Sequence, residues 1–402
     1  MSFANGDRNI IFLSDDPPLK SKGSGISVLL FNVISSLKGK NIAIITSTNS
    51  APSVTAAEIR DDNSGSKTFI YDEFASAFFQ RNKTSLIKNL VSSFYFLFKL
   101  KKVRKQIKDN DLVISVIGTS SKPLWKFLLA SASNSRAKFG LYIVDDLELI
   151  NKKLKRTVEL FIIRLLLPLC FKRADYIITI SEGLRQNYLK RYKKDSLVLL
   201  PTFSKREVLP GKRIGREKFT LLFTGGLSFL YNSTLIKIAS ILEKQNKLLD
   251  GQFELVIQTY SSYAYFKQLG FNEEYVRYSR VENRDDLKDI YINCDCFVIP
   301  YSFIEEDKSI VASSFPQKIA EIIQYGKSLL VVGPSCSSIV AFFKKNNLKY
   351  VVDENDLSHL DDLLMHLRNN KSKQTQKHLI AYERFFSKNA VESKFQKLMS
   401  LY

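Results

Sequence analysis

The feature that most constrains this fold is the alternation of short apolar runs with segments of helical periodicity. Residues 9–14 (NIIFLS) and 41–46 (NIAIIT) are apolar enough to be buried strands. Between them apolar side chains recur on one helix face, and Gly39 is the expected stop. These side chains are Ile26, Leu29, Leu30, Val33, Ile34 and Leu37. The order strand, helix, strand predicts a βαβ unit and therefore a parallel sheet.

The same alternation continues to the end of the chain, interrupted once. Residues 201–218 are rich in Pro, Gly and charge without periodicity, which predicts a linker. A chain of 402 residues is also too long for one usual core. We therefore expect an α/β fold of two Rossmann-like, doubly wound domains facing a cleft, residues 1–205 and 206–402. Whether the last helix packs back on the first domain is left open. Further strands are expected over residues 111–117, 139–144, 175–181, 219–223, 253–257, 276–278 and 296–299, and a helix over 285–292.

The charge of the chain narrows its partners without choosing among them. Sixty Lys and Arg against 40 Asp and Glu give a formal net charge of +20. Such a field attracts nucleic acid, acidic lipid or phosphate-bearing small molecules. Because no nucleic-acid recognition motif is found, we predict no nucleic-acid partner.

The cysteines and the N-terminus point to a reducing compartment. The four cysteines lack CxxC pairing and metal-ligand spacing, so we expect reduced core residues of a cytoplasmic protein and no bound metal. The first apolar run is too short for a signal peptide, and Asp15 and Asp16 follow it directly. The chain has no uninterrupted run of 18 apolar residues, so we expect no transmembrane helix. The cysteines are Cys170, Cys294, Cys296 and Cys336.

Two basic, apolar stretches leave membrane contact open. Residues 83–108 have no acidic side chain and carry apolar and aromatic residues at helical spacing. Residues 152–173 are a second basic and apolar stretch, whose apolar run is interrupted by Arg164 and Pro168. Such segments can lie in an anionic membrane interface, or they can be core helices with a solvated basic flank. A cytoplasmic protein with peripheral binding to the inner face of the membrane is therefore one expectation.

Two groups at the expected ends of strands are site candidates in the first domain. Gly23 and Gly25 precede the first helix, where the backbone can approach a ligand, although a plain turn also explains them. Asp145 and Asp146 follow strand 139–144, at the edge where ligands of open α/β sheets bind. An acidic N-cap of the next helix explains this pair equally.

The stretch 309–333 (SIVASSFPQKIAEIIQYGKSLLVVG) carries the strongest functional signal. We predict a loop ending at residues 313–316, a helix over 317–324, a stop at Gly326 and a strand over 329–332. Pro316 suits the first helical turn. Lys318 and Glu321 would then place a cation and a carboxylate near free backbone N–H groups, which suits a phosphate and a ribose. The alternative is an ordinary helix–strand unit with solvated charges.

These residues resemble the donor-nucleotide region of GT-B-fold glycosyltransferases, most closely the family-4 retaining enzymes. In that family a late Glu, matched by Glu321, binds the ribose, and a second Glu lies eight positions earlier, where this chain has Ser313. The family's G-R-L loop is matched by Gly225, Gly226 and Leu227. Its Lys five positions after the Arg is replaced by Tyr231.

Both usual cations are therefore absent from their matched positions. Lys318 is the favoured substitute, because it lies three residues before Glu321 and so on nearly the same helical face. Arg280 and Arg284 are weaker candidates, near the loop that holds the nucleotide base in the family. A backbone cradle or an inactive protein are the other outcomes.

The resemblance implies a glycosyltransferase that moves a sugar from a nucleotide-diphosphate donor to a growing, lipid-linked polysaccharide or oligosaccharide, with retention. The first domain would bind the acceptor and the second the nucleotide sugar, and no further cofactor is expected. The alternative is an inactive GT-B scaffold that binds a glycan or a partner transferase. The expected catalytic residues are Asp145, Asp146 and Lys318, and the expected donor-binding residues are Gly25, Gly225, Gly226, Arg280, Ser314, Pro316 and Glu321.

Overall fold

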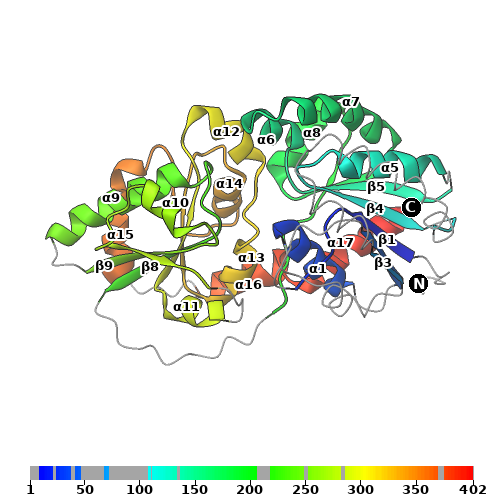
Figure 1. The fold of residues 1–402 in the computed structure, drawn as a ribbon. Coiled ribbons are helices and arrows are strands. Elements are labelled where there is room, and N and C mark those ends of the chain that lie inside the picture. Colours follow the sequence, from blue (N-terminus) through cyan, green and yellow to red (C-terminus); the bar gives the residue numbers. More distant parts are fainter. Residues whose placement is uncertain are drawn as a thin grey trace. The chain divides into compact units, whose positions relative to one another are not determined.

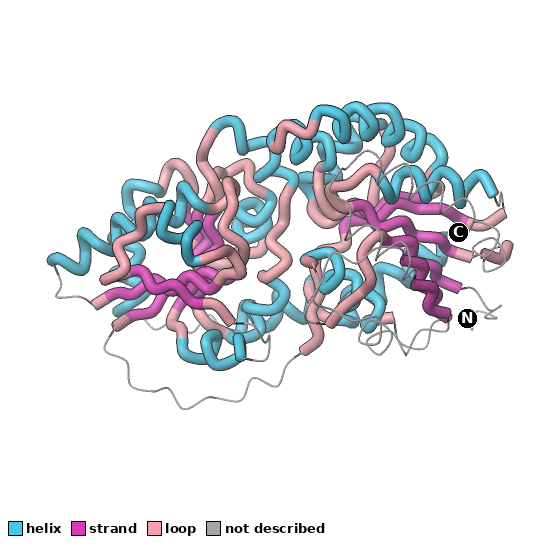
Figure 2. The backbone as a smooth tube through the Cα atoms, viewed as in Figure 1, coloured by secondary structure: helices cyan, strands magenta, loops and turns pink. Residues whose placement is uncertain are grey.

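The chain forms two compact α/β units in a computed structural model (Figure 1). The first comprises Met1–Leu200 with Lys388–Tyr402, and the second Pro201–Ser387. Each unit has its own sheet with helices around it (Figure 2). The predicted fold class, α/β with two Rossmann-like units, is confirmed. The structure describes residues 9–20, 24–37, 41–46, 68–71, 107–109, 111–133, 136–205, 218–248, 252–281, 286–369 and 375–401.

The first sheet has seven described strands, all parallel, in the order β3-β2-β1-β4-β5-β6-β7. Their β-branched and aromatic side chains are buried because parallel strands are covered on both faces. The order of strands reverses between β1 and β4, the point where doubly wound sheets bind ligands. The strands are β1 Asn9–Ser14, β2 Asn41–Thr46, β3 Thr68–Tyr71, β4 Leu112–Ile117, β5 Lys138–Ile143, β6 Tyr176–Thr179 and β7 Leu197–Val198.

Helices cover both faces of this sheet. In Figure 1, α5 and α7 lie on one face and α1 and α17 on the other. The helix α17 comes from the chain's end, and Phe395 on it lies 6.4 Å from Phe12 of β1, ring centroid to ring centroid. Val391 and Leu398 are buried beside it. The helices are α1 Gly25–Ser36, α5 Lys122–Ser133, α6 Leu147–Lys153, α7 Thr157–Arg173, α8 Glu182–Tyr192 and α17 Lys388–Leu401.

The second sheet has six described strands in the order β10-β9-β8-β11-β12-β13, again all parallel. Successive side chains of each strand point to opposite faces of the sheet, and helices cover both faces. Leu221 and Phe223 of β8 pack in the core formed with α9 and α15, whereas Thr220 and Leu222 face α11. The strands are β8 Phe219–Thr224, β9 Phe253–Gln258, β10 Val276–Ser279, β11 Cys296–Pro300, β12 Ser328–Val332 and β13 Val351–Val352.

The segment before β12 differs from the prediction. Residues up to Ser313 belong to a short helix, α12, and not to a loop. The predicted helix over 317–324 begins at Ile319 as a single α-helical turn, α13, and continues as the 3-10 turn η3. Gly326 ends it with a φ of 63°, as predicted. The remaining elements are α9 Asn232–Leu248, α10 Tyr263–Gln268, α11 Leu287–Asn293, η2 Glu305–Asp307, α12 Lys308–Ser313, α13 Ile319–Ile322, η3 Ile323–Tyr325, α14 Ser338–Lys345, η4 Leu357–His359, α15 Leu360–Asn369 and α16 Thr375–Phe385.

Several predictions fall outside the described residues. They are the stop at Gly39, the ligand roles of Gly23 and Arg284, most of the basic stretch 83–108 and most of the linker, residues 206–217. One prediction on the cysteines was wrong: Cys336 is exposed, because it lies in the turn between β12 and α14. Within the described ranges, no helix is both long and apolar enough to cross a membrane.

Candidate functional site

The glycine loop of the second unit follows β8 at the switch point of its sheet. The Gly225 N–H donates to the Gln258 carbonyl, 3.0 Å away, which fixes the start of the loop. A Cβ on Gly225 would lie 3.2 Å from the Phe223 ring, whereas one on Gly226 would meet nothing within 4 Å. The space beside Gly226 is therefore open at the edge where a nucleotide is expected.

The residue that replaces the family's loop lysine is part of the core. The ring of Tyr231 lies 5.6 Å from the Phe223 ring and 5.5 Å from the Tyr301 ring, centroid to centroid. It is an aromatic packing residue, so the loop itself supplies no cation at this position.

A chain of polar contacts runs from the end of β8 to the 318–321 turn. Thr224 Oγ1 lies 3.1 Å from the hydroxyl oxygen of Tyr291 on α11. Lys318 Nζ donates to the same hydroxyl at 3.5 Å and to Glu321 Oε2 at 3.1 Å. The structure thus connects two predicted site residues, Lys318 and Glu321, to the residue immediately before Gly225.

Burial distinguishes the two partners of this ion pair. The Glu321 side chain is 1% exposed and that of Lys318 is 30% exposed. A buried carboxylate strongly favours the cation beside it, so Glu321 holds the Lys318 ammonium in place, while the Lys318 side chain as a whole is partly exposed. Oε2 of Glu321 accepts a hydrogen bond from Lys318. The ribose-binding role of Glu321 stays a prediction.

An aromatic anchor sets the loop that carries Ser314 and Pro316. Phe315 between them is buried, and its ring centroid lies 5.6 Å from that of Phe342 and 6.3 Å from that of Phe386. The two flanking residues are partly exposed. Because α13 has only four residues, its dipole is weak, and any anion here depends mainly on Lys318.

Arg280 is separate from this group. It follows β10, two strands from β8 in the sheet, and its side chain is exposed. The structure does not bring it to the Lys318 contacts, and its role at the base stays a prediction.

In the first unit, Gly25 is the first residue of α1. The preceding Ser24 caps the helix by accepting the Ser27 N–H at 3.2 Å, and its hydroxyl donates to Asp16 Oδ2 at 2.9 Å. Gly25 itself is exposed, so it is accessible to a ligand at the end of β1. Its binding role stays a prediction.

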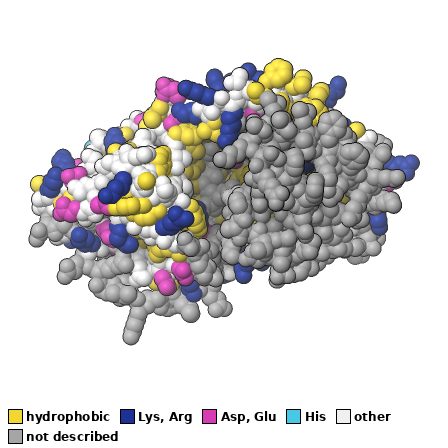
Figure 3. Space-filling model, in the orientation of Figure 1, with side chains coloured by type: hydrophobic (Ala, Val, Ile, Leu, Met, Phe, Trp, Pro, Cys, Tyr) yellow, Lys and Arg dark blue, Asp and Glu magenta, His cyan; other side chains and the backbone are white. Residues whose placement is uncertain are grey.

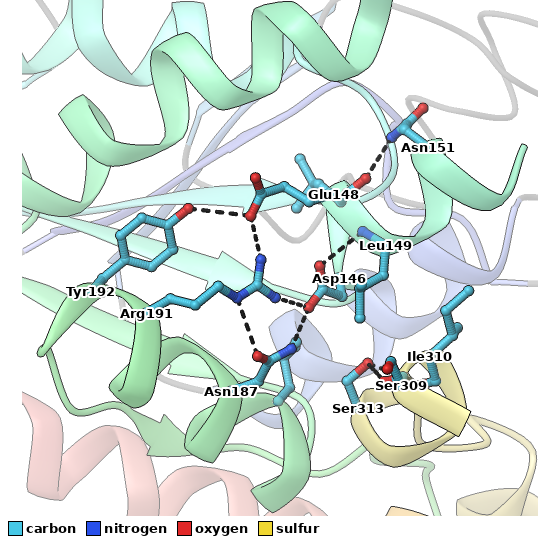
Figure 4. Close-up of polar contacts among 12 residues, drawn as sticks. Asp146, Glu148, Leu149, Asn151, Asn187, Arg191, Tyr192, Ser309, Ile310 and Ser313 are labelled. Atoms are coloured by element: carbon cyan, nitrogen blue, oxygen red, sulfur yellow. Dashed lines mark hydrogen bonds and ion pairs between the residues drawn. The ribbon is translucent and has the colours of Figure 1, made fainter. Parts of the chain in front are cut away.

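Asp146 is held by several groups at the end of β5 (Figure 4). It is the N-cap of α6 and accepts the Leu149 N–H at 3.2 Å, as the alternative explanation predicted. Its Oδ2 accepts from Asn187 Nδ2 at 2.6 Å and pairs with the Arg191 guanidinium, which also binds Glu148. These contacts give Asp146 a structural role, and its catalytic role stays a prediction.

Asp145 is in a different situation from its neighbour. Burial, with a further contribution from the Asp146 charge, raises the pKa of Asp145 from 3.8 to about 6. A carboxyl group that titrates near neutral pH at the end of a parallel strand is a functional-site candidate.

Two further residues of these regions were not anticipated. Tyr291 joins Thr224 to Lys318, but nothing in the local pattern of α11 marks it. Lys126 on α5 forms a buried ion pair with Asp15 directly after β1, at the switch point of the first sheet. The sequence pattern alone does not single out Lys126, because its pairing depends on α5 packing with that side chain toward the switch-point edge of the first sheet.

In the part of the chain that the structure describes, no cluster of three or more His, Cys, Asp or Glu side chains could hold a metal ion.

Comparison with known proteins identifies the fold of the chain but not its family. No protein-family model matches the chain, and no curated protein matches it. The chain is similar to the structure of a glycosyltransferase from Rickettsia africae ESF-5, with a TM-score of 0.63, 16% identity and 98% of each chain covered. It is also similar to an alpha,alpha-trehalose-phosphate synthase (UDP-forming) from Burkholderia xenovorans in complex with glucose-6-phosphate. There the TM-score is 0.63, the identity 9%, and the match covers 98% of this chain and 99% of that one.

A third similar structure is the Thermobaculum terrenum O-GlcNAc transferase, with a TM-score of 0.53 and 12% identity over 98% of this chain and 69% of that one. At such low identity these likenesses show the fold. The chain has the GT-B glycosyltransferase fold, as the resemblance implied.

Proposed function

We propose that the chain is a glycosyltransferase that moves a sugar from a nucleotide-diphosphate donor to a glycan acceptor. One observation carries the proposal: Lys318, fixed by buried Glu321 and by Tyr291, is joined through Thr224 to the open glycine loop after β8. This places a positioned cation close to the binding edge of a doubly wound sheet. The similar structures named as a glycosyltransferase and as an O-GlcNAc transferase support the reaction class.

The role proposed for Lys318 follows from the chemistry of sugar transfer. As the anomeric C–O bond breaks, negative charge develops on the departing diphosphate. A preorganised cation stabilises that charge more than it stabilises the bound donor, which lowers the barrier. Glu321 acts on this charge as a positioning residue, since it holds the Lys318 ammonium in place.

For stereochemistry, we propose retention by a front-face route. The acceptor hydroxyl oxygen bonds to the anomeric carbon while the bond to the diphosphate breaks, and the departing phosphate oxygen takes the hydroxyl proton. No strong base is needed, which suits a chain whose three histidines all lie beyond residue 358. Asp145, whose pKa is about 6, is the candidate in the first unit for contact with the reacting sugars.

The acceptor is proposed to be a growing polysaccharide or oligosaccharide linked to a lipid, and the protein to act at a membrane surface. The net charge of +20 and the basic, apolar segment 152–173 support this part of the proposal.

The proposal is tested by nucleotide binding and by transfer. We expect UDP or GDP to raise the melting temperature of the purified protein, and one of a panel of sugar nucleotides to be consumed when acceptor is added. Lys318→Met should reduce the thermal shift at a given nucleotide concentration, because it weakens binding. Lys308→Met is the matched control, because Lys308 forms the same type of pair with Glu305, at 2.6 Å, on an exposed surface. Absence of a shift with every nucleotide would exclude the proposal.

A specific observation favours a second candidate, an inactive scaffold that binds a glycan or a partner transferase. Tyr231, which replaces the family's loop lysine, is an aromatic packing residue, so the catalytic cation is absent at that place. Binding of nucleotide sugar without turnover, under conditions where acceptor glycans also bind, would support this candidate.

A further inference from the structure

The helix α7 is apolar on two faces, and only one of them is explained by the core. Ile163, Leu166, Leu167, Cys170 and Phe171 are buried in the first unit. The opposite face carries Val158, Phe161, Leu165 and Leu169, which are 48%, 69%, 57% and 49% exposed. We call these four residues the α7 stripe.

The stripe is continuous along the helix. Its members are spaced three, four and four residues apart, which is the spacing of a single helix face. Leu154, 43% exposed, extends it by one turn before the helix begins. In Figure 3 hydrophobic side chains gather at the top of the view, over the position of α7 in Figure 1, with Lys and Arg beside them. Such a continuous exposed apolar row on a helix indicates an interaction surface.

The charges around the stripe are almost all positive. Residues 152–173 contain one acidic side chain, Glu159, and its Oε1 accepts the Ser121 N–H at 2.5 Å, so it is engaged with the loop before α5. Arg164 is exposed between Phe161 and Leu165, and its Nε lies 3.9 Å from Oε1 of Glu148 on α6, an acidic side chain outside this segment. The basic residues of the segment are Lys152, Lys153, Lys155, Arg156, Arg164, Lys172 and Arg173.

This combination selects one occupant. The centre of a protein interface is normally depleted of charge, and a second copy of this surface would oppose cation to cation. An anionic bilayer accepts both features, because apolar side chains enter the acyl boundary while Lys and Arg reach the phosphates on flexible stems. We propose that the α7 stripe and its flanking cations dock the first unit on an anionic lipid surface, with α7 lying in the plane of the interface.

Membrane docking would bring the protein to the lipid-linked acceptor of the proposed function. Only this link to the acceptor rests on the proposed function. Docking itself needs no donor and no turnover. Its failure and the failure of the glycosyltransferase proposal can therefore be told apart, because vesicle binding is measured without nucleotide and nucleotide binding without vesicles.

The test is co-sedimentation of the full chain with phosphatidylcholine vesicles that contain or lack phosphatidylglycerol. We expect binding to the anionic vesicles only, weakening as salt rises. The double variant Phe161→Glu/Leu165→Glu should lower the affinity at least about tenfold, because it removes two inserted apolar side chains and adds repelling charge. Leu248→Glu, at a 70% exposed position of α9, is the matched control and should bind as the parent does.

Nucleotide-induced thermal shifts measured on the same variants report whether folding and the donor site survive. The proposal is overturned if the parent ignores anionic vesicles or if the double variant binds them as well as the parent. Equal binding to neutral and anionic vesicles would also overturn it. The proposal would also be overturned if the parent protein self-associates and the double variant is a monomer that binds vesicles as the parent does.

Discussion

Lys318 Nζ lies 3.1 Å from Oε2 of Glu321, and of the two side chains only the lysine reaches the surface. Removing one partner of such a pair leaves a charge buried or loosely held. The pair therefore offers a way to separate the effect of a cation on a ligand from its effect on folding.

Lys318→Met should weaken binding of the nucleoside diphosphate by about 10- to 100-fold, the value of one charge-assisted hydrogen bond. It should also lower the free energy of unfolding by about 3–5 kcal/mol, because the Glu321 carboxylate loses its cation. Titration calorimetry and urea denaturation measure the two effects. In Lys318→Met/Glu321→Met stability should return while affinity stays low; recovery of both would show that Lys318 acts only through the fold.

Tyr291→Phe removes the hydroxyl between Thr224 and Lys318 without changing the buried ring. We expect a loss of about 1 kcal/mol in unfolding free energy and a several-fold rise in the donor KM, because the ammonium loses its hydrogen bond to the Tyr291 hydroxyl. Tyr142→Phe is the control, since the Tyr142 hydroxyl is buried and has no partner among the described residues. A Tyr291→Phe variant with parental KM would mean that the Tyr291 hydroxyl does not help to position Lys318.

Asp145→Asn tests the perturbed carboxyl group of the first unit. Because its folded pKa, about 6, exceeds the ordinary value of 3.8, the unfolded chain gives up this proton more readily. Stability is therefore lost as the pH rises from about 4 to about 6, and the Asn variant should be the more stable protein at pH 7. If Asp145 serves catalysis, the variant should also lose the inflection near pH 6 in its rate profile. Retention of that inflection would assign it to another group.

The burial of His378 predicts that the second unit loses stability in acid. Its Nδ1 lies 3.1 Å from the Lys327 carbonyl, and its buried Nε2 has no partner among the described residues. Burial lowers the pKa of His378 from 6.5 to about 4, so the folded state holds it neutral. Stability is full above about pH 6.5 and falls as the pH drops toward 4, by about 2 kcal/mol between pH 7 and 5. In His378→Gln the urea midpoint should depend less on pH over this interval; an unchanged dependence would contradict the assignment.

Most of the strands could be predicted because their signal is local, whereas the short strands β3, β7 and β13 were not predicted. Runs such as NIIFLS and NIAIIT bury every position or nearly so, as parallel strands require. The helix α12 was missed for a local reason as well: its apolar residues Ile310 and Val311 are adjacent and so mark no helix face.

The candidate site was predictable only in part. The spacing of Lys318 and Glu321 placed them on one face, and their contact confirms this. The burial of Glu321 could not be read from the sequence, since an isolated Glu is normally exposed. Tyr291 comes from another helix, so its place between Thr224 and Lys318 depends on tertiary packing alone.

The return of α17 to the first unit has a consequence for synthesis. Val391, Phe395 and Leu398 complete a core that includes β1, Asn9–Ser14, so that core is unfinished until residues 388–401 have left the ribosome. The second unit, Pro201–Ser387, has no such dependence and can fold earlier. The first unit therefore completes its core after the second unit, and a nascent chain exposes an open apolar surface until α17 arrives.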